Sequence, residues 1–312
     1  MRIFVAGGTG AIGRPLVRAL GGAGHDVTVF SRHAERVTAL GLPNVVPAVG
    51  DAFDPDTVMR AVREARPEVV VNQLTALAQS VNPIAVKRGF DLTSRLRREV
   101  SGTLVAAARA AGARRVVAQS ISFAYRPGPG LRTETDPLWT DAPGQIGLLT
   151  NSLATLEAAT LRAPDVEGAV LRYGSFYGPG TYFAPGGLYA ALLAKRRLPL
   201  PGDGGGLFGL VHLDDAVSAT VAALDGPAGV FNVVDDVPAP AAEWMGLVAR
   251  LLGAKPPRHV PEGLARLGAG KFVVYLMCDQ PAVSNQRART ELGWEPAYPD
   301  WRQGLPVTLA PG

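Results

Sequence analysis

The chain has 312 residues, of which 47% are apolar and 19% charged, and this composition excludes disorder as its main state. A formal charge of +4 is too small to indicate a nucleic-acid partner, and a single cysteine, Cys278, excludes an intrachain disulfide scaffold. The composition predicts a globular protein of a reducing compartment, with one large α/β domain or two modest ones.

Apolar runs are short throughout the sequence. The first, 3–6, ends in glycines and lacks the length of the apolar core of a signal peptide. The longest others, 103–108 and 188–194, are far below the roughly 18 residues of a membrane span. We therefore expect a soluble, cytoplasmic protein without a membrane partner.

Seven short, mostly apolar and β-branched runs are typical of strands buried on both faces: 3–6, 27–30, 45–48, 69–73, 115–119, 169–173 and 230–233. Amphipathic or alanine-rich segments with a helical pattern lie between them: 12–20, 55–65, 91–111, 151–161 and 213–224. This alternation predicts a doubly wound, parallel α/β sheet of the Rossmann type.

After Tyr173 the alternation loosens into glycine- and proline-rich loops at 178–180 and 201–206. We expect a dinucleotide-binding Rossmann domain over 1–175, to which 207–235 returns. Residues 176–206 and 236–312 should form a smaller C-terminal substrate-binding lobe. Open α/β sheets bind ligands at their carboxyl edge, so the lobe is expected there.

A glycine-rich segment, Gly7-Gly8-Thr9-Gly10-Ala11-Ile12-Gly13, follows the first strand and opens the first helix. In that position glycines let backbone N–H groups approach a diphosphate, and the start of a helix directs its positive dipole at the anion. A simple turn between strand and helix is the alternative. We predict that Gly7, Gly10, Ala11, Ile12 and Gly13 bind a dinucleotide.

The end of the second strand distinguishes NAD from NADP, because an acid there binds the ribose 2′-hydroxyl whereas an arginine accommodates a 2′-phosphate. Ser31 and Arg32 occupy this point, and Arg36 follows one helical turn later. NADP(H) is therefore favoured over NAD(H), with a solvated surface arginine as the alternative. Further cofactor contacts are predicted after the third and fourth strands, at Asp51, Ala52, Gln73, Leu74 and Thr75.

Several stretches together resemble the extended short-chain dehydrogenases/reductases of the NAD-dependent epimerase/dehydratase family. They are the glycine segment 7–13 and the segments 115–120, 171–174, 177–180, 210–216, 231–233 and 291–296. The resemblance covers nearly the whole chain. It implies a bound nicotinamide dinucleotide and a homodimer formed through helices near 91–111 and 151–161.

The sequence departs from this family at the acid/base pair. Family members carry a tyrosine four residues before a lysine on one helix face, where the lysine lowers the pKa of the tyrosine. Ser152 and Glu157 match the pattern that surrounds this pair, which places Leu149 at the tyrosine position and Leu153 at the lysine position. No tyrosine in the chain has a lysine four residues later.

The remaining candidates for proton transfer follow the fifth strand. Ser120 is the best candidate, Ser122 is near it, and Tyr125 is a candidate for the missing phenol. Each has a structural alternative, since a serine at a strand end can bond local backbone and a tyrosine there can simply pack. Tyr173, Tyr177 and Tyr182 surround a glycine-rich turn and are predicted to line the substrate pocket.

No metal is expected, because the four histidines and the one cysteine have no zinc-ligand spacing. The basic segments 95–98 and 195–197 lack interleaved aromatic residues, so they indicate solvated helix faces and not a nucleic-acid site.

Two functions follow from these observations. The first is an NADP(H)-dependent oxidoreductase or epimerase that acts on a carbonyl, hydroxyl or sugar-like small molecule with a non-standard proton donor. The second is a dinucleotide-binding sensor, or a cofactor-independent isomerase or cyclase, without hydride transfer.

Overall fold

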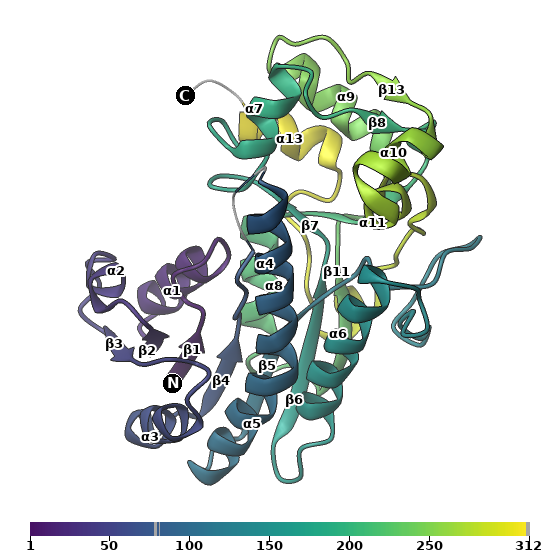
Figure 1. The fold of residues 1–312 in the computed structure, drawn as a ribbon. Helices are drawn as coiled ribbons and strands as arrows, with labels where there is room; N and C mark the ends of the chain where they lie inside the picture. Colours follow the sequence, from purple (N-terminus) through teal and green to yellow (C-terminus); the bar gives the residue numbers. More distant parts are fainter. Residues whose placement is uncertain (78–79, 81, 310–312) are drawn as a thin grey trace.

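A computed structural model describes residues 1–77, 80 and 82–309. Its centre is a parallel sheet of seven strands in the order β11-β6-β5-β4-β1-β2-β3 (Figure 1). The strands are β1 (Arg2–Ala6), β2 (Asp26–Ser31), β3 (Val45–Val49), β4 (Val69–Asn72), β5 (Arg115–Ile121), β6 (Glu167–Tyr173) and β11 (Gly229–Val233). All seven strands predicted from the sequence are present, so the doubly wound Rossmann fold is confirmed.

Helices cover both faces of the sheet. One face carries α1 (Gly13–Gly22) and α8 (Leu213–Ala222), which pack against each other. The other carries α3 (Pro55–Ala65), α4 (Pro83–Arg95), the π-helix η1 (Leu96–Val100), α5 (Ser101–Ala110) and α6 (Gln145–Leu161). A short helix, α2 (Ala34–Thr38), lies between β2 and β3.

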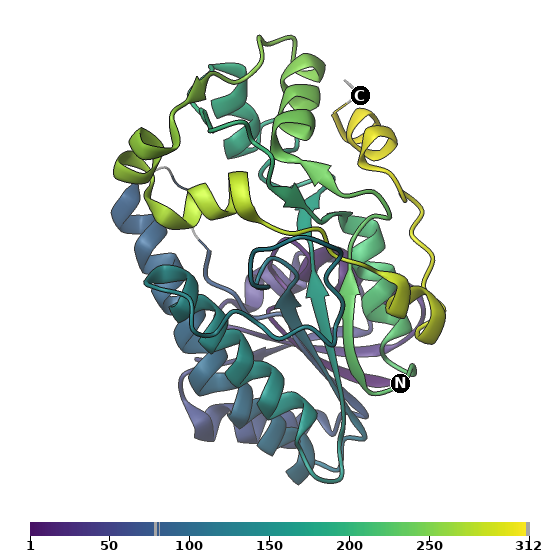
Figure 2. The ribbon, with the colours of Figure 1, turned by 90° about the vertical axis from the view of Figure 1, so that its right-hand side faces the viewer.

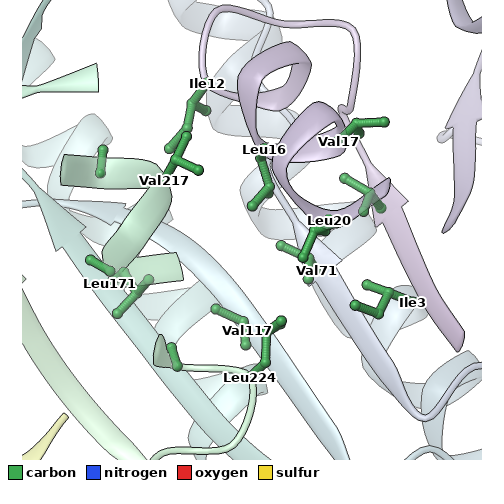
Figure 3. Packing of buried hydrophobic residues seen from close by; sticks show 14 of the residues in the cluster. Ile3, Ile12, Leu16, Val17, Leu20, Val71, Val117, Leu171, Val217 and Leu224 are labelled. Atoms are coloured by element: carbon green, nitrogen blue, oxygen red, sulfur yellow. The ribbon is translucent and has the colours of Figure 1, made fainter. Parts of the chain in front are cut away.

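The core on the α1 and α8 face is formed by apolar side chains of the sheet and of these two helices (Figure 3). Ile12, Leu16, Val17 and Leu20 of the α1 region are buried with strand residues such as Val71 and Val117. Every strand of the sheet contributes apolar residues to this layer, and α1 and α8 each contribute one apolar helix face. The arrangement holds the carboxyl ends of the strands, where the predicted site residues lie, at one edge of the sheet.

A second group of elements lies beyond that edge, in the upper part of Figures 1 and 2. Its helices are α7 (Leu188–Ala194), α9 (Ala241–Leu251), α10 (Glu262–Gly268), α11 (Gly270–Val274), the π-helix η2 (Tyr275–Asp279) and α13 (Trp301–Leu309), and α12 (Gln286–Glu291) packs against β11. Short strands connect them: β7 (Ser175–Tyr177), β8 (Leu200–Pro201), β9 (Leu207–Phe208), β10 (Leu210–His212), β12 (Ala239–Pro240) and β13 (His259–Val260).

The helix boundaries differ from the sequence predictions at two places. The segment 91–111 is part of a longer run that begins at Pro83 and contains a π-helical turn, and α6 begins at Gln145, six residues before the predicted start. Gly144, with φ 64°, precedes α6 and forms no side-chain cap. The sequence therefore has no N-cap residue that would predict the start of α6 at this point. No helix in the described ranges is long and apolar enough to cross a membrane.

Candidate active site

The glycine segment forms a tight cradle between β1 and α1. Gly7 has φ 89°, and a Cβ there would lie 2.5 Å from the carbonyl oxygen of Gln73. A Cβ on Gly13 would lie 2.2 Å from the carbonyl oxygen of Gly7, so both positions accept only glycine. Gly10 donates its N–H to that same carbonyl at 3.1 Å, and its own Cβ position is open apart from this oxygen at 3.4 Å.

The start of α1 suits an anion. Its cap residue, Ile12, makes no side-chain hydrogen bond to the first turn, and Ala11 is exposed beside it. Unpaired N–H groups at a helix N-terminus, next to a backbone kept bare by glycines, fit a dinucleotide diphosphate. The residues present therefore fit the cofactor that the sequence predicts.

The exit of β2 carries free positive charge. Ser31 accepts a hydrogen bond from the N–H of His33 at 3.1 Å, and His33 contacts Glu35 at 3.1 Å. Arg32 and Arg36 are exposed, and neither forms an ion pair with any residue of 1–77, 80 and 82–309. Glu35 is thus engaged with His33, and Arg32 and Arg36 are available to a ligand.

The next strand exits provide a polar rim. Asp51 is exposed and accepts a hydrogen bond from the N–H of Phe53 at 3.0 Å, next to half-buried Ala52. Gln73 is buried, and its Oε1 has no hydrogen-bond partner. Leu74 is half-buried and Thr75 exposed. All follow carboxyl ends of β3 or β4, on the edge that also carries the glycine cradle; their roles as cofactor contacts stay predictions.

The three residues predicted to transfer protons are all buried. Ser120 has no exposed surface, and its hydroxyl donates to Oε1 of Glu157 at 2.7 Å. Ser122 is 1% exposed, and its hydroxyl has no hydrogen-bond partner. The Tyr125 hydroxyl donates to Oδ1 of Asn232 at 2.8 Å and accepts from Nη1 of Arg172 at 2.6 Å.

Ser120 and Tyr125 are joined by a buried ion pair between α6 and β6. Arg172 donates from Nε to Oε1 of Glu157 at 2.9 Å and from Nη2 to Oε2 at 2.7 Å, a bidentate pairing. Burial raises the pKa of Tyr125 to about 12. This ion pair was not predicted from the sequence, where its signal is Arg172, a charged residue within the apolar run 169–173.

The helix face at which the sequence resemblance predicts the family's acid/base pair is apolar. Leu149 and Leu153 are 4% and 0% exposed, and they form one cluster with Ile121 and Ala124. Phe123, Leu138 and Phe272 pack against this cluster. No described side chain of this cluster can donate or accept a proton.

The three tyrosines predicted to line the substrate pocket each contact a different partner. Tyr173 is fully buried with its hydroxyl 2.7 Å from Oγ1 of Thr220, and burial raises its pKa to about 12. Tyr177 is 1% exposed and donates to Oδ2 of Asp235 at 3.1 Å. Tyr182 is half-buried, with its ring centroid 5.1 Å from that of Tyr189. Their substrate role stays a prediction.

Asp235 is a titratable group that the sequence analysis missed. It follows β11, is 3% exposed, and its Oδ1 has no hydrogen-bond partner. Burial, together with the negative charges of Asp215 and Asp300, raises its pKa to about 9. Among the described residues, no group of three or more histidine, cysteine or acidic side chains could hold a metal ion.

A family model described as the NAD dependent epimerase/dehydratase family matches residues 3–233. The chain belongs to this family. The resemblance seen in the sequence is confirmed, and the protein is an NAD(P)-dependent oxidoreductase of the epimerase/dehydratase family.

Similar proteins match this chain over at least 98% of its length. A Streptomyces protein described as 3-diazoavenalumate denitrifying reductase is 48% identical over 308 residues, which are 98% of this chain and 99% of that protein. The solved structure of the dTDP-glucose 4,6-dehydratase DesIV of Streptomyces venezuelae, with NAD and TYD bound, has a TM-score of 0.78 at 22% identity, covering 99% of this chain and 96% of that one. The human epimerase family protein SDR39U1 with NADPH has a TM-score of 0.75 at 21% identity, covering 99% of each chain.

Proposed function

We propose that this family member is an NADPH-dependent reductase that removes nitrogen from a diazo compound. The reductase relative at 48% identity supports the substrate class, since its name describes a denitrifying reductase of a 3-diazo compound. The observation that carries the proposal is the buried apolar cluster at Leu149 and Leu153, the two positions at which the sequence resemblance predicts the family's tyrosine and lysine. The chemistry proposed here has no need of that pair.

The proposed reaction does not need a tyrosine and a lysine because of where negative charge develops during it. Reduction of a carbonyl builds negative charge on oxygen, and a proton donor must neutralise it. When bound, NADPH would supply a hydride. If the diazo compound reacts as its diazonium ion, this hydride would form the new C–H bond at the carbon that carries N2⁺ while the C–N bonding electrons leave with N2. No oxygen anion forms, so an apolar wall at Leu149 and Leu153 is compatible with the reaction. It also excludes water from the reacting carbon.

The preference for NADPH rests on Arg32. It follows β2 directly, is exposed and makes no ion pair within the described ranges, so its guanidinium is free to bind a 2′-phosphate. The glycine cradle and the start of α1 would hold the diphosphate, and the exits of β3 and β4 would border the remainder of the cofactor.

A carbonyl, hydroxyl or sugar-like substrate, the expectation from the sequence, finds less support. The Ser120 and Tyr125 hydroxyls both donate to fixed internal acceptors, Glu157 and Asn232. Delivery of either proton to a substrate would break a buried hydrogen bond and leave its acceptor unpaired.

The test uses 4-carboxybenzenediazonium and NADPH deuterated at C4 of the nicotinamide, with reactions lacking protein as the control for uncatalysed reduction. We expect protein-dependent formation of benzoate that carries deuterium at the ring carbon, measured by mass spectrometry. Acetophenone offered in place of the diazonium ion should not be reduced. Binding of NADPH without deuterated benzoate above the control would contradict the proposal and favour a sensor or a cofactor-independent reaction.

A variant tests the argument about the apolar face itself. Leu149→Tyr combined with Leu153→Lys restores the family pair at the i, i+4 spacing. We expect this double variant to gain reduction of acetophenone, which the unmodified protein lacks. Leu149→Phe combined with Leu153→Met is the matched control, because it keeps the face apolar.

A further inference from the structure

Arg97 is a buried arginine without an acidic partner. It lies in the π-helix η1, only 4% of its surface is exposed, and its Nη1 has no hydrogen-bond partner. It forms no ion pair with any carboxylate in the described part of the chain, and burial lowers its pKa to about 10, so it is charged at neutral pH. An unpaired buried charge is costly, which indicates that something outside this chain completes the site.

The helix face that carries Arg97 lies against the exit of β4. Thr93, four residues earlier, accepts a hydrogen bond from the N–H of Ala76 at 2.9 Å. Ser101, four residues later, accepts one from Nδ2 of Asn72 at 3.3 Å. Residues four apart share a helix face, so Arg97 lies between two contacts with the strand exit. The π-helical turn is a second sign, because such turns occur frequently at functional sites.

The same helical run borders the apolar cluster that replaces the acid/base pair. Phe90, two turns before Arg97, meets Phe272 edge to face with ring centroids 5.7 Å apart. Phe272 packs on the cluster of Leu149 and Leu153, and η1 itself packs on α6, which carries these two leucines. The run α4–η1 thus carries both the buried guanidinium of Arg97 and Phe90, whose ring meets Phe272 of α11.

The cofactor diphosphate is not the anion that suits Arg97. The glycine cradle for the diphosphate opens into α1, on the opposite face of the sheet from α4, η1 and α6. Ser120, Leu149 and Leu153, by contrast, lie on the face of Arg97, as the contact of Ser120 with Glu157 of α6 shows. The anion that pairs with Arg97 is therefore not the cofactor diphosphate.

We propose that Arg97 binds the carboxylate of an aromatic substrate acid whose ring packs on the apolar wall around Phe272. This rests on the proposed function, which places a small reducible substrate at the Leu149 and Leu153 face. The planar guanidinium matches a carboxylate with two parallel hydrogen bonds, and these bonds are strong where water is excluded. The positive charge that the family places on α6 is then supplied by the neighbouring helix.

Binding of benzoate, and of benzamide as its neutral isostere, tests this by calorimetric titration of the NADP⁺-loaded protein. We expect the unmodified protein to bind benzoate at least tenfold more tightly than benzamide. Arg97→Met should abolish this preference, and Arg97→Lys should keep part of it. Arg98→Met, which removes the adjacent exposed arginine, is the matched control and should change nothing.

Thermal unfolding of the free protein supplies a readout that does not depend on ligand or activity. Arg97→Met should unfold at the same or a higher temperature, because it removes an unpaired buried charge. A lower unfolding temperature of Arg97→Met would show that Arg97 has a structural role and would overturn the inference. Equal losses of benzamide and benzoate binding in this variant would overturn it as well. So would an unmodified protein that binds benzoate no more tightly than benzamide. If the unmodified protein forms deuterated benzoate but Arg97→Met still prefers benzoate to benzamide, only the inference about Arg97 is refuted and the proposed function stands. An Arg97-dependent preference without reduction would refute only the proposed function.

Discussion

At the residue scale, Arg32 is placed to decide which dinucleotide binds. A charged hydrogen bond to a 2′-phosphate is worth about 1.5–3 kcal/mol, or about 10- to 150-fold in affinity. Arg32→Ala should therefore weaken the binding of NADPH by that factor and change the affinity for NADH by no more than about threefold. Calorimetric titration measures both, with Arg18→Ala, an exposed arginine of α1, as control. Equal weakening of the two cofactors would contradict the assignment.

Ser120 is the second residue whose role is testable. The sequence predicts a proton donor, whose loss would lower turnover at least tenfold. Its hydroxyl instead donates to Glu157 in the interior, and the proposed reaction requires no proton. We expect Ser120→Ala to keep turnover within about threefold and to lower the free energy of unfolding by about 1 kcal/mol, as for one buried hydrogen bond. Steady-state kinetics and denaturant unfolding measure the two effects. A tenfold loss of turnover at unchanged stability would instead support Ser120 as a proton donor.

At the scale of elements, the β1–α1 turn contains a glycine that the fold requires, Gly13, and a glycine whose Cβ position is nearly free, Gly10. An alanine methyl group at Gly13 would lie 2.2 Å from the Gly7 carbonyl oxygen, so the turn must open. Gly13→Ala should cost about 1–3 kcal/mol of stability and abolish NADPH binding. Gly10→Ala meets only the same oxygen at 3.4 Å, so it should leave the fold intact while it hinders the approach of the diphosphate. Denaturant unfolding and fluorescence titration with NADPH distinguish these outcomes; similar loss of stability in both variants would contradict the geometry.

The contact of Asp235, which follows β11, with Tyr177 of β7 connects the stability of the fold to pH. Asp235 ionises at about 9 in the folded protein, whereas its ordinary pKa is 3.8. Between these values the folded protein holds a proton that the unfolded chain has lost, so stability falls as pH rises through this window. Asp235→Asn removes the titration and should be increasingly more stable than the unmodified protein from pH 5 to pH 8. Urea unfolding at each pH, with exposed Asp56→Asn as control, measures the difference; parallel curves would contradict a raised pKa.

At the scale of the whole molecule, we propose a homodimer through η1, α5 and α6, which pack together on one face of the sheet (Figure 1). Leu148 on α6 is 63% exposed, as expected of a residue that a partner would cover. Light scattering at micromolar concentration should give the mass of two protomers, and Leu148→Arg should shift it to one. Leu267→Arg on α10, where the side chain is 86% exposed, should stay dimeric. A protomer mass for the unmodified protein would refute the proposal.

The sequence determined the strands and the glycine cradle because both depend on neighbours along the chain. Each strand is a short run of apolar residues buried on both faces, so composition alone marks it. The cradle is a fixed spacing of glycines between a strand and a helix, and the close approaches at Gly7 and Gly13 occur within a few residues or with the adjacent β4 exit. The sequence also predicts the loss of the acid/base pair, because no tyrosine in the chain has a lysine four residues later; this stays a prediction.

Only the tertiary structure decided which polar groups meet. Ser120 is 37 residues from Glu157, and Tyr177 is 58 residues from Asp235. The burial of Arg97 depends on how α4, η1 and α6 pack against one another, and the π-helical turn has no signal in the local pattern. Proton transfer, charge pairing and pKa depend on distances between side chains and on their exclusion from water. These quantities are fixed when the layers pack, so the order of residues along the chain does not reveal them.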